Sequence, residues 1–152
     1  MLALGLMLLI GCGAPAFLFL LGDKSGPAVV YVFPNGFRGS FRMFEDRNAA
    51  EVPLVGGKYV VAIPSDGFLS AKDLNFLSQW HAEEARFEDG TPLPTLPTKT
   101  ETGLAMFSGG ISTNGTPGVR WSDGFVGTWK EAHGQGGMRT GRAEWKGKGL
   151  AP

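Results

Sequence analysis

The sequence predicts a mainly β fold, a small antiparallel sandwich or open barrel behind an N-terminal transmembrane or signal helix. Residues 1–22 carry no charged side chain, and all 14 basic and 14 acidic residues follow them in this chain of 152. The 24 glycines and 10 prolines disfavour a helical bundle. Short β-branched and aromatic runs alternate with turn residues along the later chain.

Residues 1–22 are predicted to be a membrane anchor or signal segment. A helix of the 21 uncharged residues 1–21 spans roughly 30 Å, the thickness of a bilayer core. A single span is favoured. Residues 9–12 (LIGC) also resemble the lipobox of bacterial lipoproteins, in which Cys12 would carry lipid, and residues 14–16 (APA) resemble a signal-cleavage site. A buried helix is disfavoured, because a domain this small could hardly cover every face of it.

The expected location is therefore the cell membrane or envelope, with the chain single-pass or lipid-anchored through residues 1–22 and the domain extracytoplasmic. The orientation is an assumption, because no Lys or Arg precedes the apolar run. Cys12 is the single cysteine, which excludes an intramolecular disulfide and a cysteine-based zinc site.

Residues 23–27 form a polar linker, and a β domain is predicted over residues 28–133. Residues 28–33 (AVVYVF) have the composition of a strand, and Pro34, Asn35 and Gly36 predict a turn. Residues 38–45 alternate as a second strand, so the first two strands are predicted to form an antiparallel hairpin.

Further strands follow in order. Residues 52–54 predict a short edge segment because proline cannot donate to a sheet. Residues 58–63 (KYVVAI) are the clearest strand, ended by a turn at 64–67 (PSDG), after which residues 68–70 resume the sheet.

The middle of the chain is less regular. Residues 71–80 fit helical turns or an irregular strand, residues 80–87 fit helix or strand, and the proline-containing residues 91–102 predict a loop. Residues 104–107, 118–121 and 124–129 predict strands, for a total of five to eight. The predicted core, chosen by period-two placement, is Val30, Val32, Phe41, Tyr59, Val61, Ile63 and Phe125.

Residues 134–152 are predicted to be a flexible, glycine-rich basic tail. They have few apolar side chains with which to offset the entropy of ordering. Arg139, Arg142, Lys146 and Lys148 could attract anionic lipid headgroups or envelope polymers, although such charge runs are usually just solvated.

No catalytic residue, metal ligand or cofactor is predicted. The chain lacks GxxxxGK[ST], GxSxG and HExxH. His81 and Glu83 have the H-x-E form of zinc deaminases, but the cysteine ligands of that family are missing. Zero formal net charge gives no reason to expect nucleic acid as a partner.

Three weaker features remain. His81, Glu83, Glu84, Glu88 and Asp89 form a locally acidic patch whose spacing matches no cation-binding loop, so a solvated face is favoured. His133 is expected to be a flexible surface residue. The aromatic residues Trp80, Trp121, Phe125 and Trp129 fit a stacking platform for a carbohydrate or cation, although core packing is favoured for them.

Three segments carry a family resemblance: residues 33–39 (FPNGFRG), residues 57–69 (GKYVVAIPSDGFL) and residues 125–128 (FVGT). Together they resemble an uncharacterised family of small bacterial membrane-anchored or lipoprotein β domains, a domain of unknown function. The resemblance covers roughly residues 28–131. It implies a location behind a signal or lipoprotein sequence and no catalytic residues.

Two functional hypotheses follow. The first is a membrane-tethered, non-enzymatic β domain of the bacterial cell envelope with an interaction or structural role, whose partners are the membrane and an envelope protein or polymer. The second is an envelope hydrolase or metal-dependent enzyme that uses His81 with nearby carboxylates. The second requires His81, Glu83 and Asp123 to lie together.

Overall fold

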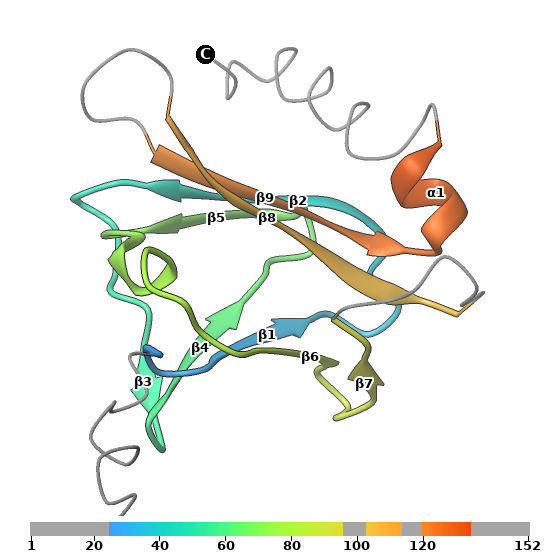
Figure 1. The fold of residues 1–152 in the computed structure, drawn as a ribbon, viewed down its shortest axis with the longest axis horizontal. Coiled ribbons are helices and arrows are strands. Elements are labelled where there is room, and N and C mark those ends of the chain that lie inside the picture. Colours follow the sequence, from blue (N-terminus) through green and yellow to red (C-terminus); the bar gives the residue numbers. More distant parts are fainter. Residues whose placement is uncertain (1–24, 96–102, 114–119, 135–152) are drawn as a thin grey trace, which may run out of the picture.

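The computed structural model describes residues 25–95, 103–113 and 120–134, which form a mainly β, sandwich-like pair of sheets (Figure 1). Sheet A has the strand order β3–β4–β1–β6–β7, and sheet B has the order β5–β2–β9–β8. Within the described ranges the strands do not close into a barrel. The predicted fold class is thus confirmed as mainly β, with corrections to its strand pairing.

The described residues contain nine strands rather than the predicted five to eight. Two of the nine, β3 and β7, have only two residues each. Their bounds are β1 Val29–Phe33, β2 Gly39–Glu45, β3 Leu54–Val55, β4 Lys58–Ala62, β5 Phe68–Ala71, β6 Glu83–Phe87, β7 Pro92–Leu93, β8 Ala105–Thr113 and β9 Arg120–Gly127.

Strand β1 lies at the centre of sheet A and pairs in parallel with both β4 and β6. Strands β2 and β5 are also parallel, so the prediction of antiparallel pairing is wrong for these three pairs. The predicted β1–β2 hairpin is wrong as well, because β4 and β6 occupy both edges of β1. The chain turns after β1, where the Phe37 amide donates to the Pro34 carbonyl at 3.0 Å, and crosses to sheet B.

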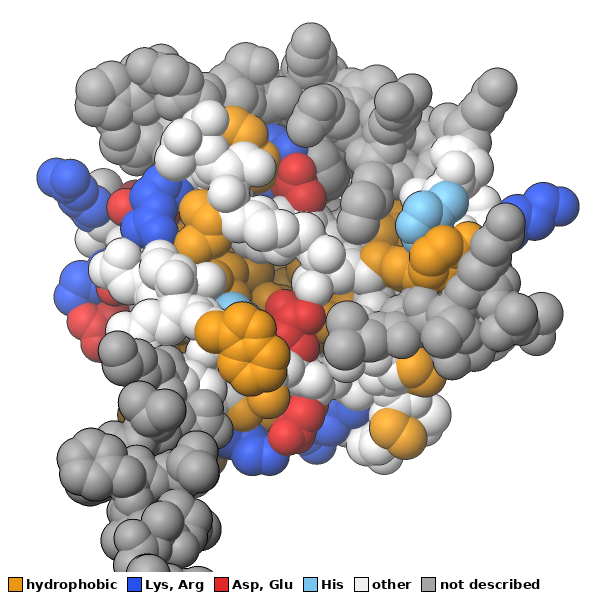
Figure 2. Space-filling view, viewed as in Figure 1, with side chains coloured by type: hydrophobic (Ala, Val, Ile, Leu, Met, Phe, Trp, Pro, Cys, Tyr) orange, Lys and Arg blue, Asp and Glu red, His pale blue; other side chains and the backbone are white. Residues whose placement is uncertain are grey.

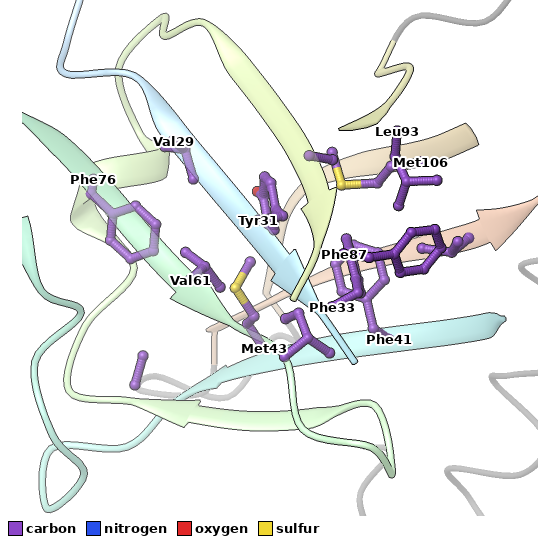
Figure 3. Close-up of a cluster of buried hydrophobic side chains, with 14 of the residues drawn as sticks. Val29, Tyr31, Phe33, Phe41, Met43, Val61, Phe76, Phe87, Leu93 and Met106 are labelled. Carbon is purple, nitrogen blue, oxygen red and sulfur yellow. The ribbon is translucent and has the colours of Figure 1, made fainter. Parts of the chain in front are cut away.

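The core lies between the two sheets (Figure 3). Val29, Tyr31 and Phe33 of β1 are at most 1% exposed and point toward sheet B, where Phe41 and Met43 meet them. The Phe41 ring centroid lies 5.9 Å from that of Tyr31 and 5.2 Å from that of Phe33. These contacts join the two sheets.

The predicted core residues of β2 and β4 do lie between the sheets, whereas those predicted for β1 lie on its outer face. Phe41, Val61 and Ile63 belong to the core, and Tyr59 packs against it. Side chains alternate along a strand, so Val30 and Val32 point to the outer face of sheet A. Val30 is nevertheless buried there and Val32 is half-buried. Phe125 is buried in a second cluster with Phe107 and Ala132, on the outer face of sheet B.

The segments that the sequence left open are now defined. Residues 71–80 contain a 3₁₀-helix, η2, at Asn75–Leu77, and residues 83–87 are strand β6. The two strands expected at 118–121 and 124–129 are parts of β9. Helix α1, Trp129–His133, was not predicted; its capping box, in which Thr128 and Glu131 bond reciprocally, was present in the sequence as T-x-x-E.

None of the helices in the described ranges has the length and hydropathy needed to cross a bilayer. Residues 1–22, with Cys12, lie outside the described residues, as does the predicted tail apart from Gly134. The anchor and the domain boundaries therefore stay predictions.

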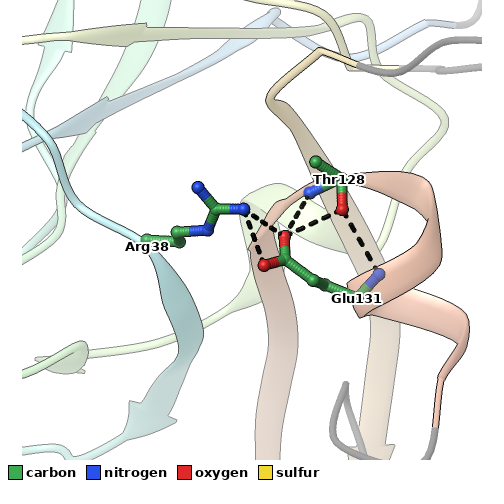
Figure 4. Close-up of polar contacts among 3 residues, drawn as sticks. All are labelled: Arg38, Thr128 and Glu131. Atoms are coloured by element: carbon green, nitrogen blue, oxygen red, sulfur yellow. Dashed lines mark hydrogen bonds and ion pairs between the residues drawn. The ribbon is translucent and has the colours of Figure 1, made fainter.

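Helix α1 is tied to the crossover between the sheets through Glu131 (Figure 4). The Glu131 carboxylate accepts bonds from the Thr128 amide at 2.8 Å and from Arg38 Nη2 at 2.6 and 2.7 Å. The Thr128 amide bond, followed by the Arg38 and Thr128 side-chain bonds, lowers the pKa of Glu131 to about 2. Arg38 lies just before β2, 93 residues from Glu131 in the sequence. The Glu131 carboxylate therefore both caps helix α1 and holds it to the segment between β1 and β2.

Because the pKa of Glu131 is lowered on folding, its ionised form stabilises the fold above the ordinary value of 4.5, and that stabilisation is lost as the pH falls toward about 2. We therefore expect Glu131→Gln to melt at a lower temperature than the wild type near neutral pH. The gap should narrow as the pH is lowered through this window. Thermal unfolding followed by circular dichroism checks this, and a pH-independent gap would contradict it.

The face assignment of β1 can be tested with two valines of one strand. Val29→Ala removes buried core contacts and should lower the free energy of unfolding by about 2 kcal/mol. Val32→Ala, the matched control on the outer face, should cost less than about 1 kcal/mol because its side chain is only half-buried. Equal losses in urea unfolding would show that the face assignment is wrong.

Candidate functional site

A hollow of about 660 Å³ lies between the segment that leads into β6, the first residue of β6 and the middle of β8, and we name it the Glu83 hollow. Its walls combine apolar with polar side chains. The ones that matter below are Tyr31, Leu77, Trp80, His81, Glu83, Ser108 and Ile111. Figure 2 shows this face, with apolar side chains gathered near its middle beside acidic ones.

Strand register places Glu83 in the interior. Glu83 pairs with Val29 of β1, a core residue, so its side chain points toward sheet B, as those of Ala85 and Phe87 do. Glu83 is the first residue of β6 and therefore reaches the hollow rather than the packed core. Its side chain is 20% exposed.

Two neutral donors hold the Glu83 carboxylate. Ser108 Oγ donates to Glu83 Oε2 at 2.5 Å, and the Tyr31 hydroxyl is also hydrogen-bonded to Glu83. Burial, followed by the negative charge of Glu83, raises the pKa of Tyr31 far above its usual value. Tyr31 therefore stays protonated and serves as a donor. Neither partner neutralises the charge of the carboxylate.

His81 presents a second acceptor to the same place. Its Nδ1 lies 2.6 Å from the Gln79 carbonyl oxygen, and a carbonyl can only accept, so Nδ1 carries the proton in the neutral ring. Nε2 is then an acceptor, 3.7 Å from Glu83 Oε1. Two acceptors that face each other favour a hydrogen-bond donor placed between them.

The backbone beside the site is shaped by a β-bulge. Gly109 and Gly110 of β8 interrupt the pairing with β9 between Ser108 and Ile111, and both glycines line the hollow. A Cβ on Gly109 would lie 2.8 Å from the Asp123 carbonyl oxygen, so only glycine fits there without a shift. Such bulges often occur beside functional sites, where they redirect side chains.

The acidic patch predicted from the sequence is divided between different surfaces. His81 and Glu83 meet in the hollow. Glu84 points to the opposite face of sheet A and bonds Lys58 Nζ at 2.6 Å, whereas Asp89 lies beyond the other end of β6, with Glu88 beside it. In the described ranges, no three His, Cys, Asp or Glu side chains come together in a way that could hold a metal ion.

Asp123 is also separate from His81. It lies on the outer face of sheet B, where its two oxygens accept from Arg42 Nε at 2.5 Å and Nη2 at 2.9 Å. Arg42 is 1% exposed, and its guanidinium lies 5.3 Å from the Trp121 ring centroid. The three-residue combination required by the enzyme hypothesis is therefore not formed, although its His81–Glu83 pair is.

The four aromatic residues do not form one platform. Trp80 is 79% exposed beside the hollow, whereas Trp121 is buried near Arg42. Trp129 packs against the second cluster and stacks on His133, with centroids 3.8 Å apart. His133 is exposed, as expected, but it also bonds the Trp129 carbonyl at 3.0 Å.

Sequence reasoning missed Tyr31 and Ser108. Tyr31 stood inside an apolar strand and Ser108 followed another, and neither position carries a local signal for function. They reach Glu83 only because β1, β6 and β8 converge, which involves chain separations of 52 and 25 residues.

Comparisons with known proteins identify no family. No family model matches the chain, and no curated protein matches it in sequence. It is similar to a crystal structure described as "Putative Lipoprotein from Bacillus anthracis", with a TM-score of 0.45 and 15% identity over 74% of this chain and 80% of that chain. A score and an identity this low carry no argument about function. The family resemblance noted in the sequence stays a prediction.

Proposed function

We propose that the chain is a membrane-tethered, non-enzymatic binding module of the bacterial cell envelope, which takes an ammonium-bearing ligand in the Glu83 hollow. The observation that carries the binding proposal is the Glu83 carboxylate, which is largely buried, is bonded to neutral donors and faces an unfilled space. The tether rests on the uncharged residues 1–22.

The chemistry of the hollow selects the ligand class. A buried charge is stabilised best by an opposite charge that also donates hydrogen bonds. An ammonium group can donate to Glu83 Oε1 and to His81 Nε2 together. The apolar side chains of Leu77 and Ile111 would then cover the rest of the ligand.

The arrangement favours binding over catalysis. In a serine hydrolase the serine donates to a histidine, which the acid orients. Here Ser108 donates directly to Glu83, and His81 lies on the other carboxylate oxygen. Tyr31 has its pKa raised and is therefore a poor general base near neutral pH. The alternative hypothesis, an envelope hydrolase or metal-dependent enzyme using His81 and nearby carboxylates, loses support because it requires Asp123 beside His81 and Glu83, and Asp123 is bonded to Arg42 on the outer face of sheet B.

The tether is tested by fractionation. The full chain should sediment with membranes and resist extraction by high salt or carbonate, whereas a chain beginning at Asp23 should be soluble. Mass spectrometry should find Met1 retained for a span, lipid on Cys12 for a lipoprotein, or a new terminus near Phe17 for a cleaved signal. Cys12→Ser should leave a span in the membrane and abolish lipidation. Full-length protein that is soluble, uncut and unlipidated would contradict the tether.

The binding site is tested with three probes of one shape: benzylammonium, benzyl alcohol and benzoate. Benzylammonium should bind with a Kd of about 1 mM, a normal affinity for a ligand of this size, and shift the NMR signals of Trp80 and Ser108. Benzyl alcohol should bind more weakly, and benzoate should not bind.

Matched variants of neighbouring carboxylates complete this test. Glu83→Gln should weaken benzylammonium binding roughly tenfold or more, because it removes the charge and keeps the shape. Glu84→Gln, on the opposite face of the same strand, should leave binding unchanged. Equal binding of benzoate, or equal losses in the two variants, would count against the proposed ligand class.

A further inference from the structure

Three large hydrophobic side chains are exposed in the described part of the chain. Leu54 is 55% exposed, Val55 is 61% exposed and Trp80 is 79% exposed. They come from segments 25 residues apart, yet the topology of sheet A brings them to a single edge. Large apolar side chains that are exposed along one edge of a small domain are a candidate contact surface.

The parallel pairing of sheet A defines this edge. Strands β1, β4 and β6 run in the same direction, so their first residues lie along one border, which we name the amino edge. Val55 pairs with Lys58, the first residue of β4, and Trp80 stands three residues before β6. Leu54 is adjacent to Val55 in β3.

The chain enters sheet A at the same edge. The Gly26 amide donates to the Trp80 carbonyl at 2.7 Å, and the Tyr59 amide donates to the Ala28 carbonyl at 2.9 Å. Strand β1 lies between β4 and β6, so the entering chain has the β3–β4 hairpin on one side and the Trp80 segment on the other (Figure 1).

Little chain separates this entrance from the predicted anchor. Leu21, the last of the uncharged apolar run, and Ser25, the first described residue, are four residue steps apart, with three residues between them. A fully extended chain of that length covers at most about 14 Å. An anchored apolar segment would therefore keep the amino edge close to the bilayer.

The opposite edge of sheet A has a different character. Its turns follow β1, β4 and β6 and expose Asn35, Ser65, Asp66 and Asp89, all of them polar. Charges near the amino edge are largely paired, with Lys58 bonded to Glu84 and Lys72 bonded to Glu51 at 2.5 Å. The amino edge thus combines exposed apolar side chains with two paired lysines, and the Glu83 carboxylate at the start of β6 is recessed in the hollow, with its side chain 20% exposed.

We propose that the amino edge of sheet A rests on the lipid bilayer, with Trp80, Leu54 and Val55 in the interfacial region on either side of the entering chain. Tryptophan is favoured at this depth of a membrane because its ring is apolar and its N–H is polar. This inference rests on the proposed tether. It adds a fixed orientation, in which the domain lies against the membrane instead of hanging freely from its linker.

Quenching of Trp80 fluorescence by lipids tests the proposal in the full chain. The protein is placed in nanodiscs of phosphatidylcholine with or without bromine on the acyl chains. The contribution of Trp80 is the difference in emission between the wild type and Trp80→Phe. We expect brominated lipid to quench about half of this contribution or more.

Two further variants give the test its controls. In Trp80→Phe/Ser65→Trp the reporter is moved to the opposite edge, and the added emission should be unaffected by bromine. Leu54→Ser/Val55→Ser alters only exposed side chains and should reduce the quenching of Trp80 while the melting temperature stays unchanged.

The outcomes separate this inference from the tether on which it rests. A chain that migrates with the nanodiscs while Trp80 is unquenched overturns the docked orientation and leaves the tether standing. Equal quenching at positions 80 and 65 also overturns it. A chain that fails to migrate with the nanodiscs overturns the tether and the docked orientation together.

Discussion

The parallel pairing of β1 with both β4 and β6 is the constraint on which the rest of the structure depends. It leaves no edge of β1 for β2, so the chain must cross to a second sheet and a sandwich-like pair results. It also brings the amino ends of three strands together, which places the chain entrance, the β3–β4 hairpin and the Trp80 segment along one border. The carboxyl ends carry the polar turns.

The same pairing explains why a carboxylate lies in the interior. Along β6 the inward positions are Glu83, Ala85 and Phe87, and the two apolar ones join the core. A carboxylate deeper in that core would cost several kcal/mol unless it were paired. At the first position of the strand it instead borders a hollow, where Ser108 and Tyr31 supply hydrogen bonds without supplying charge.

Comparison of two carboxylates shows why Glu83 is the better candidate for function. Asp123 has both oxygens bonded to Arg42, which also lies over the rings of Trp121 and Phe44, so its charge is compensated within the fold. Removing one member of such a buried pair is expected to destabilise the protein strongly. Glu83 is bonded to the neutral Ser108 and Tyr31, no Lys or Arg in the described part of the chain forms an ion pair with it, and its carboxylate faces the hollow.

The sequence by itself determined the β class, the turns after β1 and β4, and the strands β4 and β5, because apolar alternation and turn residues act over a few neighbouring positions. It also indicated that His81 and Glu83 are close, since they are two residues apart. It could not determine the inward face of β1, because every position of AVVYVF is apolar or aromatic and shows no period of two. Strand direction, the separation of Asp123 from His81, and the meeting of Tyr31, Ser108 and Glu83 were decided by the tertiary structure. These depend on which strands pair across long stretches of chain, and that choice is made by packing of the whole core rather than by local residue preference.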